Sequence, residues 1–273
     1  MHIQLVSDLH IEFWKDLDVL KHIKPVAPIL ILLGDICCAS TDYDFTLYKN
    51  AVSQLTLHYD HIIIITGNHE YYTNNAREPL KTISQTDMQI KAFCKTNKKL
   101  HFLQNKSFKL KTPSGTYLFI GSTLWSNIPR SAHNNILNIM SDYSQIYTQS
   151  EIKNKIGYHN KQIRLIKPAD ICSLHKKNVS YIEKKVRYAH SNGYKCIVLT
   201  HHKPYLKNTH NINSYDPAYE TDLKYIFPHV LLWAYGHTHI ADNRKILGAK
   251  LYSNPHGYPN ENTNYNPAQC IKI

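Results

Sequence analysis

Five short apolar runs along the chain are each followed closely by an aspartate, an asparagine or a histidine. The runs are Ile3–Val6, Ile29–Leu33, Ile62–Thr66, Cys196–Thr200 and Val230–Ala234. The polar segments after them are Ser7-Asp8-Leu9-His10, Gly34-Asp35, Gly67-Asn68-His69-Glu70, His201-His202 and Gly236-His237-Thr238-His239. Short β-rich runs that alternate with longer helical segments are typical of an α/β protein. Ligands of open α/β sheets bind at the carboxyl ends of the strands, so we expect these polar side chains to converge.

The remaining pattern completes one α/β domain. Further strands are predicted over Tyr117–Ile120 and Lys250–Tyr252, and helices over Tyr43–His58, Glu78–Cys94 and Asp170–Ser191. The stretch 122–167 is rich in Asn, Ser and Tyr and shows no strong strand pattern, so we interpret it as a cap or insertion. Within it, Trp125 and Tyr143 could stack on a base or pack in the core. No linker divides the chain, which predicts a single domain over 1–273.

The polar residues at the strand ends are all of metal-ligand types. Residues i and i+2 of an extended segment point the same way, so Asp8 with His10, and His237 with His239, can each present two side chains to one side. Two carboxylates, one amide oxygen and several imidazoles suit Mn²⁺, Fe²⁺ or Zn²⁺ better than Ca²⁺. Glycine immediately before three of the candidates lets the chain turn sharply and keeps side chains out of the site. These candidates are Asp35, Asn68 and His237.

A lone Asp-x-His or Gly-Asp motif is not specific, but the occurrence of all five polar segments in this order is specific. Together the segments resemble the five ordered motifs of the calcineurin-like metallophosphoesterase superfamily, and they span residues 8–239. The resemblance implies an α/β fold, a four-layer α-β-β-α sandwich of two mixed β-sheets flanked by helices, with two divalent metal ions at the strand ends. It implies that one ion is held by Asp8, His10, Asp35 and His239, and the other by Asp35, Asn68, His201 and His237.

The implied activity is hydrolysis of a phosphoric ester by a hydroxide that bridges the two metal ions. The substrate would be a small or nucleotide-like phosphodiester or phosphomonoester. Mn²⁺ is the first expectation for the metal, with Fe and Zn²⁺ as alternatives. His69 follows the ligand Asn68 and would protonate the leaving group, with an unidentified carboxylate holding its other ring nitrogen. His202 competes with His201 for the fourth motif. Because the family places the ligand directly after the strand, we assign His201 to the metal and leave His202 to support the ligands or face the substrate.

Other functions remain open at this point. A nuclease acting on DNA or RNA is favoured by the net charge of +12 and the pI of about 9.3. The chain shows no dense basic stripe or aromatic ladder that would support it. A non-catalytic scaffold is less favoured because every motif residue is present. Protein serine/threonine phosphatases carry arginines after the second motif, whereas this chain has Ile36-Cys37-Cys38-Ala39 there. The sequence therefore does not favour a protein serine/threonine phosphatase.

Several features set expectations about context. The longest apolar stretches are far shorter than the roughly 18 residues needed to span a membrane, and no signal peptide is visible. We therefore expect a cytoplasmic protein whose partner is its phosphate-ester substrate. Among the unassigned histidines, His159 and His256 stand out as candidates for a functional role. The tail Asn254–Pro267 is predicted to be an ordered loop, and no chemistry is assigned to it.

Overall fold

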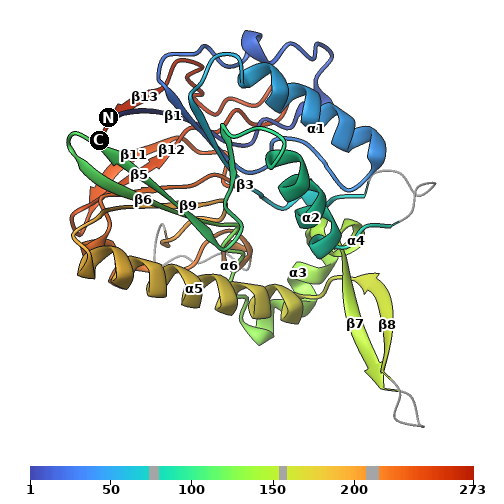
Figure 1. The fold of residues 1–273 in the computed structure, drawn as a ribbon. Coiled ribbons are helices and arrows are strands. Elements are labelled where there is room, and N and C mark those ends of the chain that lie inside the picture. The colour runs from blue at the N-terminus through green and yellow to red at the C-terminus, as the bar shows by residue number, and fades with distance from the viewer. Residues whose placement is uncertain (74–79, 154–158, 207–214) are drawn as a thin grey trace.

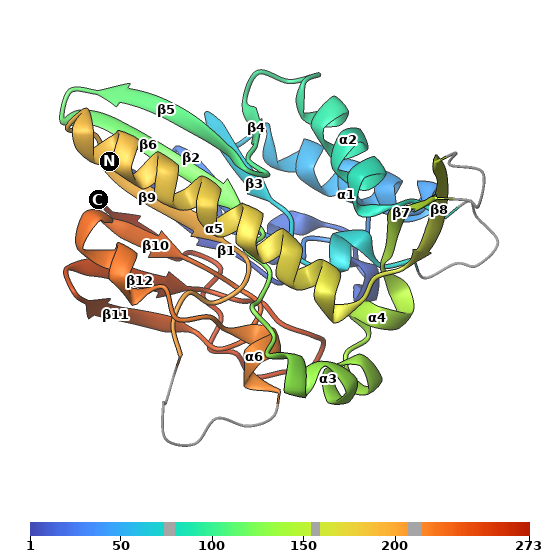
Figure 2. The same ribbon diagram turned by 90° about the horizontal axis from the view of Figure 1, so that it is seen from below.

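The computed structural model describes residues 1–73, 80–153, 159–206 and 215–273. They form two mixed β-sheets packed face to face, with helices on the outer face of each (Figure 1). Figure 2 shows α5 crossing one sheet, with α1 and α2 beside the other. This arrangement confirms the predicted four-layer α/β sandwich.

The first sheet has the order β13-β1-β2-β3-β4. Its strands are β1 (His2–Val6), β2 (Ile29–Leu33), β3 (His61–Ile65), β4 (Leu100–Phe102) and β13 (Cys270–Lys272). Strands β1 to β4 run parallel, and β13 is antiparallel to β1. The carboxyl ends of β1, β2 and β3 therefore meet at one edge of the sheet.

The second sheet has the order β11-β12-β10-β9-β6-β5. Its strands are β5 (Lys106–Thr112), β6 (Gly115–Ser122), β9 (Lys195–Thr200), β10 (Leu232–Ala234), β11 (Asp242–Ile246) and β12 (Ala249–Ser253). The four central strands are parallel, while β5 and β11 are antiparallel edge strands. The predicted strands all lie in these sheets, whereas the edge strands β5, β11 and β13 and the short β4 were not predicted.

The core has three layers because the central strands are buried on both faces. In β2, Leu30 and Leu32 pack toward α1, whereas Ile31 packs between the two sheets. On the second sheet, Val198 faces α5 and Ile197 faces the other sheet. A strand that buries both faces reads as a continuous apolar run, which is why these strands are evident in the sequence.

Three long helices cover the outer faces. They are α1 (Asp42–Leu55), α2 (Ile83–Cys94) and α5 (Pro168–Ser191); short helices are α3 (His133–Ile139), α4 (Asp142–Gln145) and α6 (Asp216–Tyr219). Short 3-10 helices lie at η1 (Ile11–Phe13), η2 (Val19–Lys21), η3 (His69–Tyr71), η4 (Arg130–Ala132) and η5 (Lys224–His229). The predicted helix Glu78–Cys94 begins only at Ile83, since Thr82 caps it with a capping box. Its predicted start, Glu78, lies outside the described residues.

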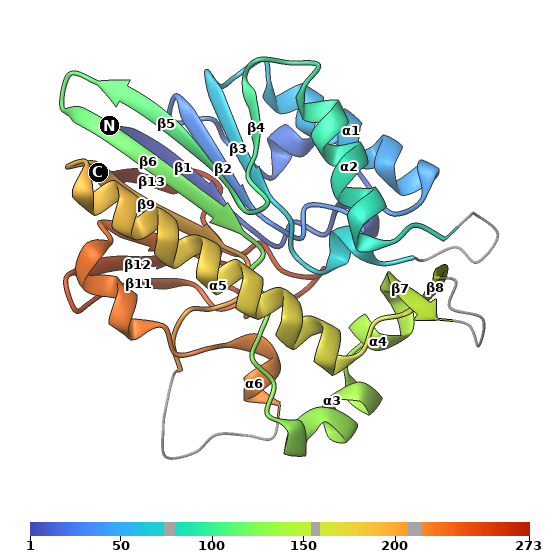
Figure 3. The same ribbon diagram turned by 60° about the horizontal axis from the view of Figure 1, so that its bottom comes forward.

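The stretch 122–167 does contain strands, so the expectation of none was wrong. Strands β7 (Tyr147–Lys153) and β8 (His159–Leu165) pair as an antiparallel hairpin that projects from the body (Figure 3). Residues 161 to 163 of β8 are exposed, so the hairpin lacks the apolar alternation by which a half-buried strand is recognised. Trp125 and Tyr143 are buried in an apolar cluster. Of the two alternatives, they therefore pack in the core and do not stack on a base. Within the described residues no helix is long and apolar enough to cross a membrane.

Candidate metal centre

The loops after β1, β2, β3, β9 and β10 meet at one end of the sandwich. Their backbones turn sharply because five candidate residues adopt left-handed conformations, with φ between 48° and 68°. These residues are Asp8, His10, Asp35, His237 and His239. Non-glycine residues seldom adopt this conformation, and clusters of them are typical of functional sites. The predicted geometry of an extended i, i+2 pair was therefore wrong, since all four residues of the two pairs have a positive φ.

Two glycines allow the loops to approach so closely. Gly34 has a φ of +87°, and a Cβ there would lie 2.4 Å from the backbone nitrogen of Gly67. A Cβ at Gly67 would lie 2.1 Å from Oδ1 of Asp35 and 2.6 Å from Nε2 of His201. Both positions therefore require glycine, as the sequence indicated.

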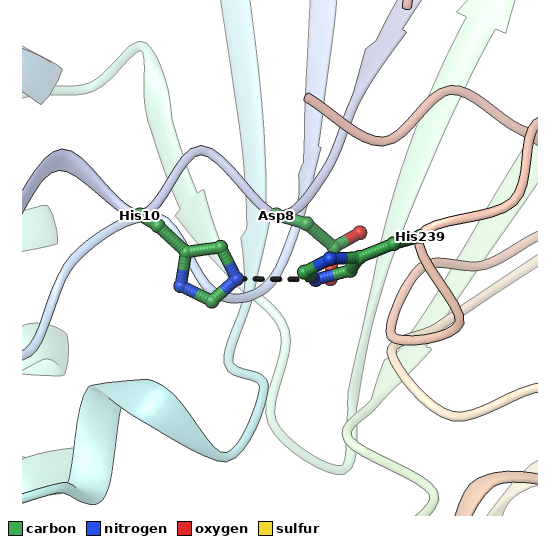
Figure 4. A group of neighbouring side chains, drawn as sticks. All are labelled: Asp8, His10 and His239. Atoms are coloured by element: carbon green, nitrogen blue, oxygen red, sulfur yellow. Dashed lines mark hydrogen bonds and ion pairs between the residues drawn. The ribbon is translucent and has the colours of Figure 1, made fainter. Parts of the chain in front are cut away.

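The first group of candidate ligands combines Asp8, His10 and His239. Figure 4 shows the three side chains turned toward one another, two from the loop after β1 and one from the loop after β10. Nε2 of His10 lies 3.2 Å from Nε2 of His239, which lies 3.5 Å from Oδ1 of Asp8. The Asp8 carboxylate also accepts a hydrogen bond of 2.9 Å from the backbone N–H of His237.

The second group combines Asp35, Asn68, His201 and His237. Nε2 of His201 lies 3.2 Å from Oδ2 of Asp35 and 3.2 Å from Oδ1 of Asn68. One ligand atom each from Asp35, His201 and His237 lies within 4.8 Å of the others. Nδ1 of His201 donates to the carbonyl of Leu33 over 2.8 Å, which leaves Nε2 for the site. His237 and His239, expected to face one side, thus serve different groups.

The donor atoms of both groups suit a bound cation. Ligand atoms that are each about 2.1 Å from one ion stand roughly 3 to 3.5 Å from one another, and the separations of 3.2 to 3.5 Å given above fall in that range. Nε2 of His237 is buried without a hydrogen-bond partner, although buried polar atoms are rarely left unpaired. A metal ion would satisfy that nitrogen. The division of the ligands between two ions stays a prediction.

The buried carboxylates dominate the electrostatics of the site. Burial opposes ionisation of Asp35, but the charges of His201 and His69 hold its pKa well below the usual range. Burial likewise lowers the pKa of His201, yet the charge and hydrogen bond of Asp35 raise it to about 10. Burial and the charges of neighbouring histidines push the pKa of His237 well below its ordinary value, so its ring is neutral. A neutral imidazole is the form that binds a metal.

His69 lies beside both groups, and its partner is Glu12, which the sequence did not identify. Oε1 of Glu12 accepts a hydrogen bond of 3.0 Å from Nδ1 of His69 and lies 3.3 Å from Nδ1 of His10. Burial lowers the pKa of His69, but the charge of Asp35 and the hydrogen bond to Glu12 raise it above its usual value. Glu12 stands two residues after His10, but the turn η1 that aims it at His69 left no signal in the sequence.

Two further side chains support the ligands. Glu70 accepts backbone hydrogen bonds from Gly67, Asp35 and Ile36 over 2.7 to 3.0 Å, which joins the loops after β2 and β3. His202 is buried, and its ring centroid lies 4.1 Å from that of His237. Burial and the charge of His201 lower the pKa of His202 to about 3. His202 thus packs behind a candidate ligand and does not line the pocket described next.

A pocket of about 320 Å³ opens beside the two groups. Ile139 and Met140 of the stretch 122–167 line one side, and Tyr258 and Glu261 of the tail line another. Neither pair was predicted, because only the tertiary fold brings these segments to the strand ends. His256 lies outside this pocket, where its Nε2 is 3.0 Å from Nδ1 of His22. The side chain of His159 lies outside the described part of the structure.

Comparison with known proteins agrees with this geometry. The family model for calcineurin-like phosphoesterases matches residues 1–241. The chain is 30% identical over 292 residues to the uncharacterized protein L509 of Acanthamoeba polyphaga mimivirus, a match that covers 99% of this chain and 96% of the relative. The fold of this chain is similar to that of the phosphopantetheinyl hydrolase of Mycobacterium tuberculosis. The TM-score is 0.69 at 15% identity, and the match covers 94% of this chain and 89% of that chain. The chain therefore belongs to the calcineurin-like phosphoesterase family.

Proposed function

We propose that this protein hydrolyses phosphoric esters with two divalent metal ions held at the strand ends. The observation that carries the proposal is the position of Asp35 between the two groups of candidate ligands. Its Oδ2 lies 3.2 Å from Nε2 of His201 in one group and 3.8 Å from Nε2 of His10 in the other. A carboxylate placed in this way can bridge two ions, as two-metal phosphoesterases require.

The donor set favours Mn²⁺, with Fe²⁺ and Zn²⁺ as alternatives, because it mixes imidazoles with carboxylates and an amide oxygen. One ion would be held by Asp8, His10, Asp35 and His239, and the other by Asp35, Asn68, His201 and His237. When bound there, such ions would polarise the phosphoryl group and supply the nucleophile at neutral pH. The protein itself fixes the ligands through the hydrogen bonds of Leu33, Glu70 and the backbone of His237.

His69 is the proposed general acid. Its ring lines the pocket, and Glu12 holds Nδ1, so Nε2 is the nitrogen that remains for proton transfer. The raised pKa of His69 favours the protonated ring that a general acid requires. His69 would give this proton to the oxygen of the departing alcohol as the ester bond breaks.

The pocket supports a small or nucleotide-like ester as substrate. Its volume of about 320 Å³ is at the lower end of ligand pockets. Among the described residues that line it there is no lysine or arginine, so it offers little to a polyanion. A nuclease of the same family remains the second candidate because of the net charge of +12. Oligonucleotide binding that weakens steeply with added salt would favour the nuclease.

The test is a screen of metals against substrates. Protein stripped with a chelator would be reloaded with Mn²⁺, Zn²⁺ or Fe²⁺ and assayed on nitrophenyl mono- and diesters, cyclic nucleotides and oligonucleotides. We expect hydrolysis that needs added metal and is best on a small ester. Two tightly bound ions without hydrolysis of any ester would instead support a non-catalytic scaffold.

A further inference from the structure

The C-terminal tail pairs with the loop after β1 and extends into the candidate site. The backbone N–H groups of His256 and Gly257 donate to the carbonyls of Ser7 and Asp8, each over 2.9 Å. Gly257 has a φ of +82°, and a Cβ there would lie 2.5 Å from Thr263. The tail is thus bound along the first motif and turns sharply toward the pocket, although it lies beyond residues 1–241 matched by the family model.

This turn places Tyr258 over the candidate general acid. The hydroxyl of Tyr258 lies 3.1 Å from Nε2 of His69, and its ring centroid lies 4.4 Å from that of His10. Glu261 fixes the residue, because its Oε2 accepts 3.0 Å and 2.6 Å hydrogen bonds from the Tyr258 backbone and from Nδ1 of His239. Tyr258 is nevertheless 41% exposed and lines the pocket, so a substrate can reach its hydroxyl.

Both ring nitrogens of His69 are already engaged. Glu12 takes Nδ1, Tyr258 takes Nε2, and the Tyr72 ring stacks on His69 at 4.1 Å between centroids. Only 7% of His69 is exposed. A leaving group in the pocket therefore meets the hydroxyl of Tyr258 where it would otherwise meet the imidazole.

We propose that Tyr258 is a catalytic residue that relays the proton from His69 to the leaving group. The inference rests on the proposed function, in which His69 is the general acid. As the bond between phosphorus and the leaving oxygen breaks, that oxygen takes the hydroxyl proton of Tyr258. The phenol oxygen takes the Nε2 proton of His69 in the same step, and Tyr258 ends as it began. His69 is left neutral, with Nδ1–H still donated to Glu12, and solvent returns its proton.

The test compares Tyr258→Phe with His69→Ala on a nitrophenyl ester and an alkyl ester of the same phosphate. A nitrophenolate leaves without a proton, whereas an alkoxide needs one. We expect Tyr258→Phe to lower kcat on the alkyl ester at least about tenfold more than on the nitrophenyl ester, as loss of general acid catalysis does. Tyr265→Phe is the matched control from the same tail. Its hydroxyl bonds to the carbonyl of His22, and the ratio of the two rates should stay as in the wild type.

A second measurement needs no metal and no turnover. In metal-free protein the ¹⁵N resonance of His69 Nε2 should move in Tyr258→Phe, while Nδ1 stays with Glu12. The relay is overturned if that resonance does not move, or if Tyr258→Phe keeps the wild-type rate ratio while His69→Ala changes it. In the second case the proposed function stands. If His69→Ala also keeps the ratio, both the assignment of His69 as the general acid and the relay are wrong.

Discussion

Oδ1 of Asp142 accepts a hydrogen bond of 2.9 Å from the side-chain amide of Asn68, 74 residues away in the chain. The hydroxyl of Tyr72 donates to the same oxygen over 2.6 Å. These contacts turn the amide nitrogen of Asn68 toward α4, so that its oxygen faces His201. The stretch 122–167 therefore contributes a side chain that orients a candidate ligand.

Asp142→Ala should weaken metal binding by about 10- to 100-fold, the usual effect of removing a group that orients a ligand. Asn68 could then rotate its amide and present nitrogen to the ion. Asp142→Asn keeps an acceptor oxygen and should lose less. Competition with a chelator, followed by metal analysis, measures both variants. Unchanged affinity in Asp142→Ala would show that Asn68 needs no such support.

His69→Ala should leave the metal content intact, since His69 belongs to neither group of proposed ligands. Turnover of alkyl esters should fall by about 10²- to 10⁴-fold, the usual contribution of a general acid. Nitrophenyl esters should lose much less, because their leaving group departs without a proton. Equal losses on both esters would argue against this role for His69.

Substrate preference should depend on Met140, which lines the pocket. Met140→Ala is expected to change the ratio of kcat/KM between bulky and small esters by about 5- to 150-fold, because a contact in the pocket is worth about 1 to 3 kcal/mol. Metal content should not change. Met88→Ala, at an exposed position of α2, is the matched control. An unchanged ratio in Met140→Ala would mean that Met140 does not select the substrate.

Acid should weaken the fold partly through His101. Burial and the neighbouring His61 lower the pKa of His101 from 6.5 to about 4. The folded protein therefore binds fewer protons than the unfolded chain as pH falls from 6.5 toward 4, and stability is lost across that window. When the pH is lowered from about 7.5 to 5, the free energy of unfolding of His101→Gln should fall by about 1 kcal/mol less than that of the wild type. This figure allows for solvent screening at the half-buried ring.

Urea unfolding at both pH values measures this difference. His58→Gln changes an exposed histidine and should behave like the wild type. The assignment to His101 fails if the two variants lose equal stability on acidification.

The sequence predicted the central strands and the convergence of their ends because both depend on local sequence patterns. Ile29–Leu33 is apolar throughout and buried on both faces, so its strand and the turn at Gly34-Asp35 were evident. The hairpin of β7 and β8 left no such pattern, since much of it is exposed. The long helix α5, with its apolar stripe, was predicted to within two residues at its start.

The supporting residues of the site could not be predicted, because each depends on contacts between distant segments. Glu12 reaches His69 across 57 positions, and Asp142 reaches Asn68 across 74. Tyr258 approaches His69 across 189 positions through a tail to which no chemistry was assigned. Local spacing identifies residues that share a motif, but it says little about which side chain fills the space behind them.

The most direct test of the account is the metal content and turnover of Asp35→Asn. The wild type should bind two divalent ions per chain and hydrolyse a small phosphoric ester in their presence. Asp35→Asn withdraws the proposed bridging charge from both ions, so it should lose most of the bound metal and its activity. Retention of two ions together with wild-type turnover in Asp35→Asn would contradict the two-metal assignment.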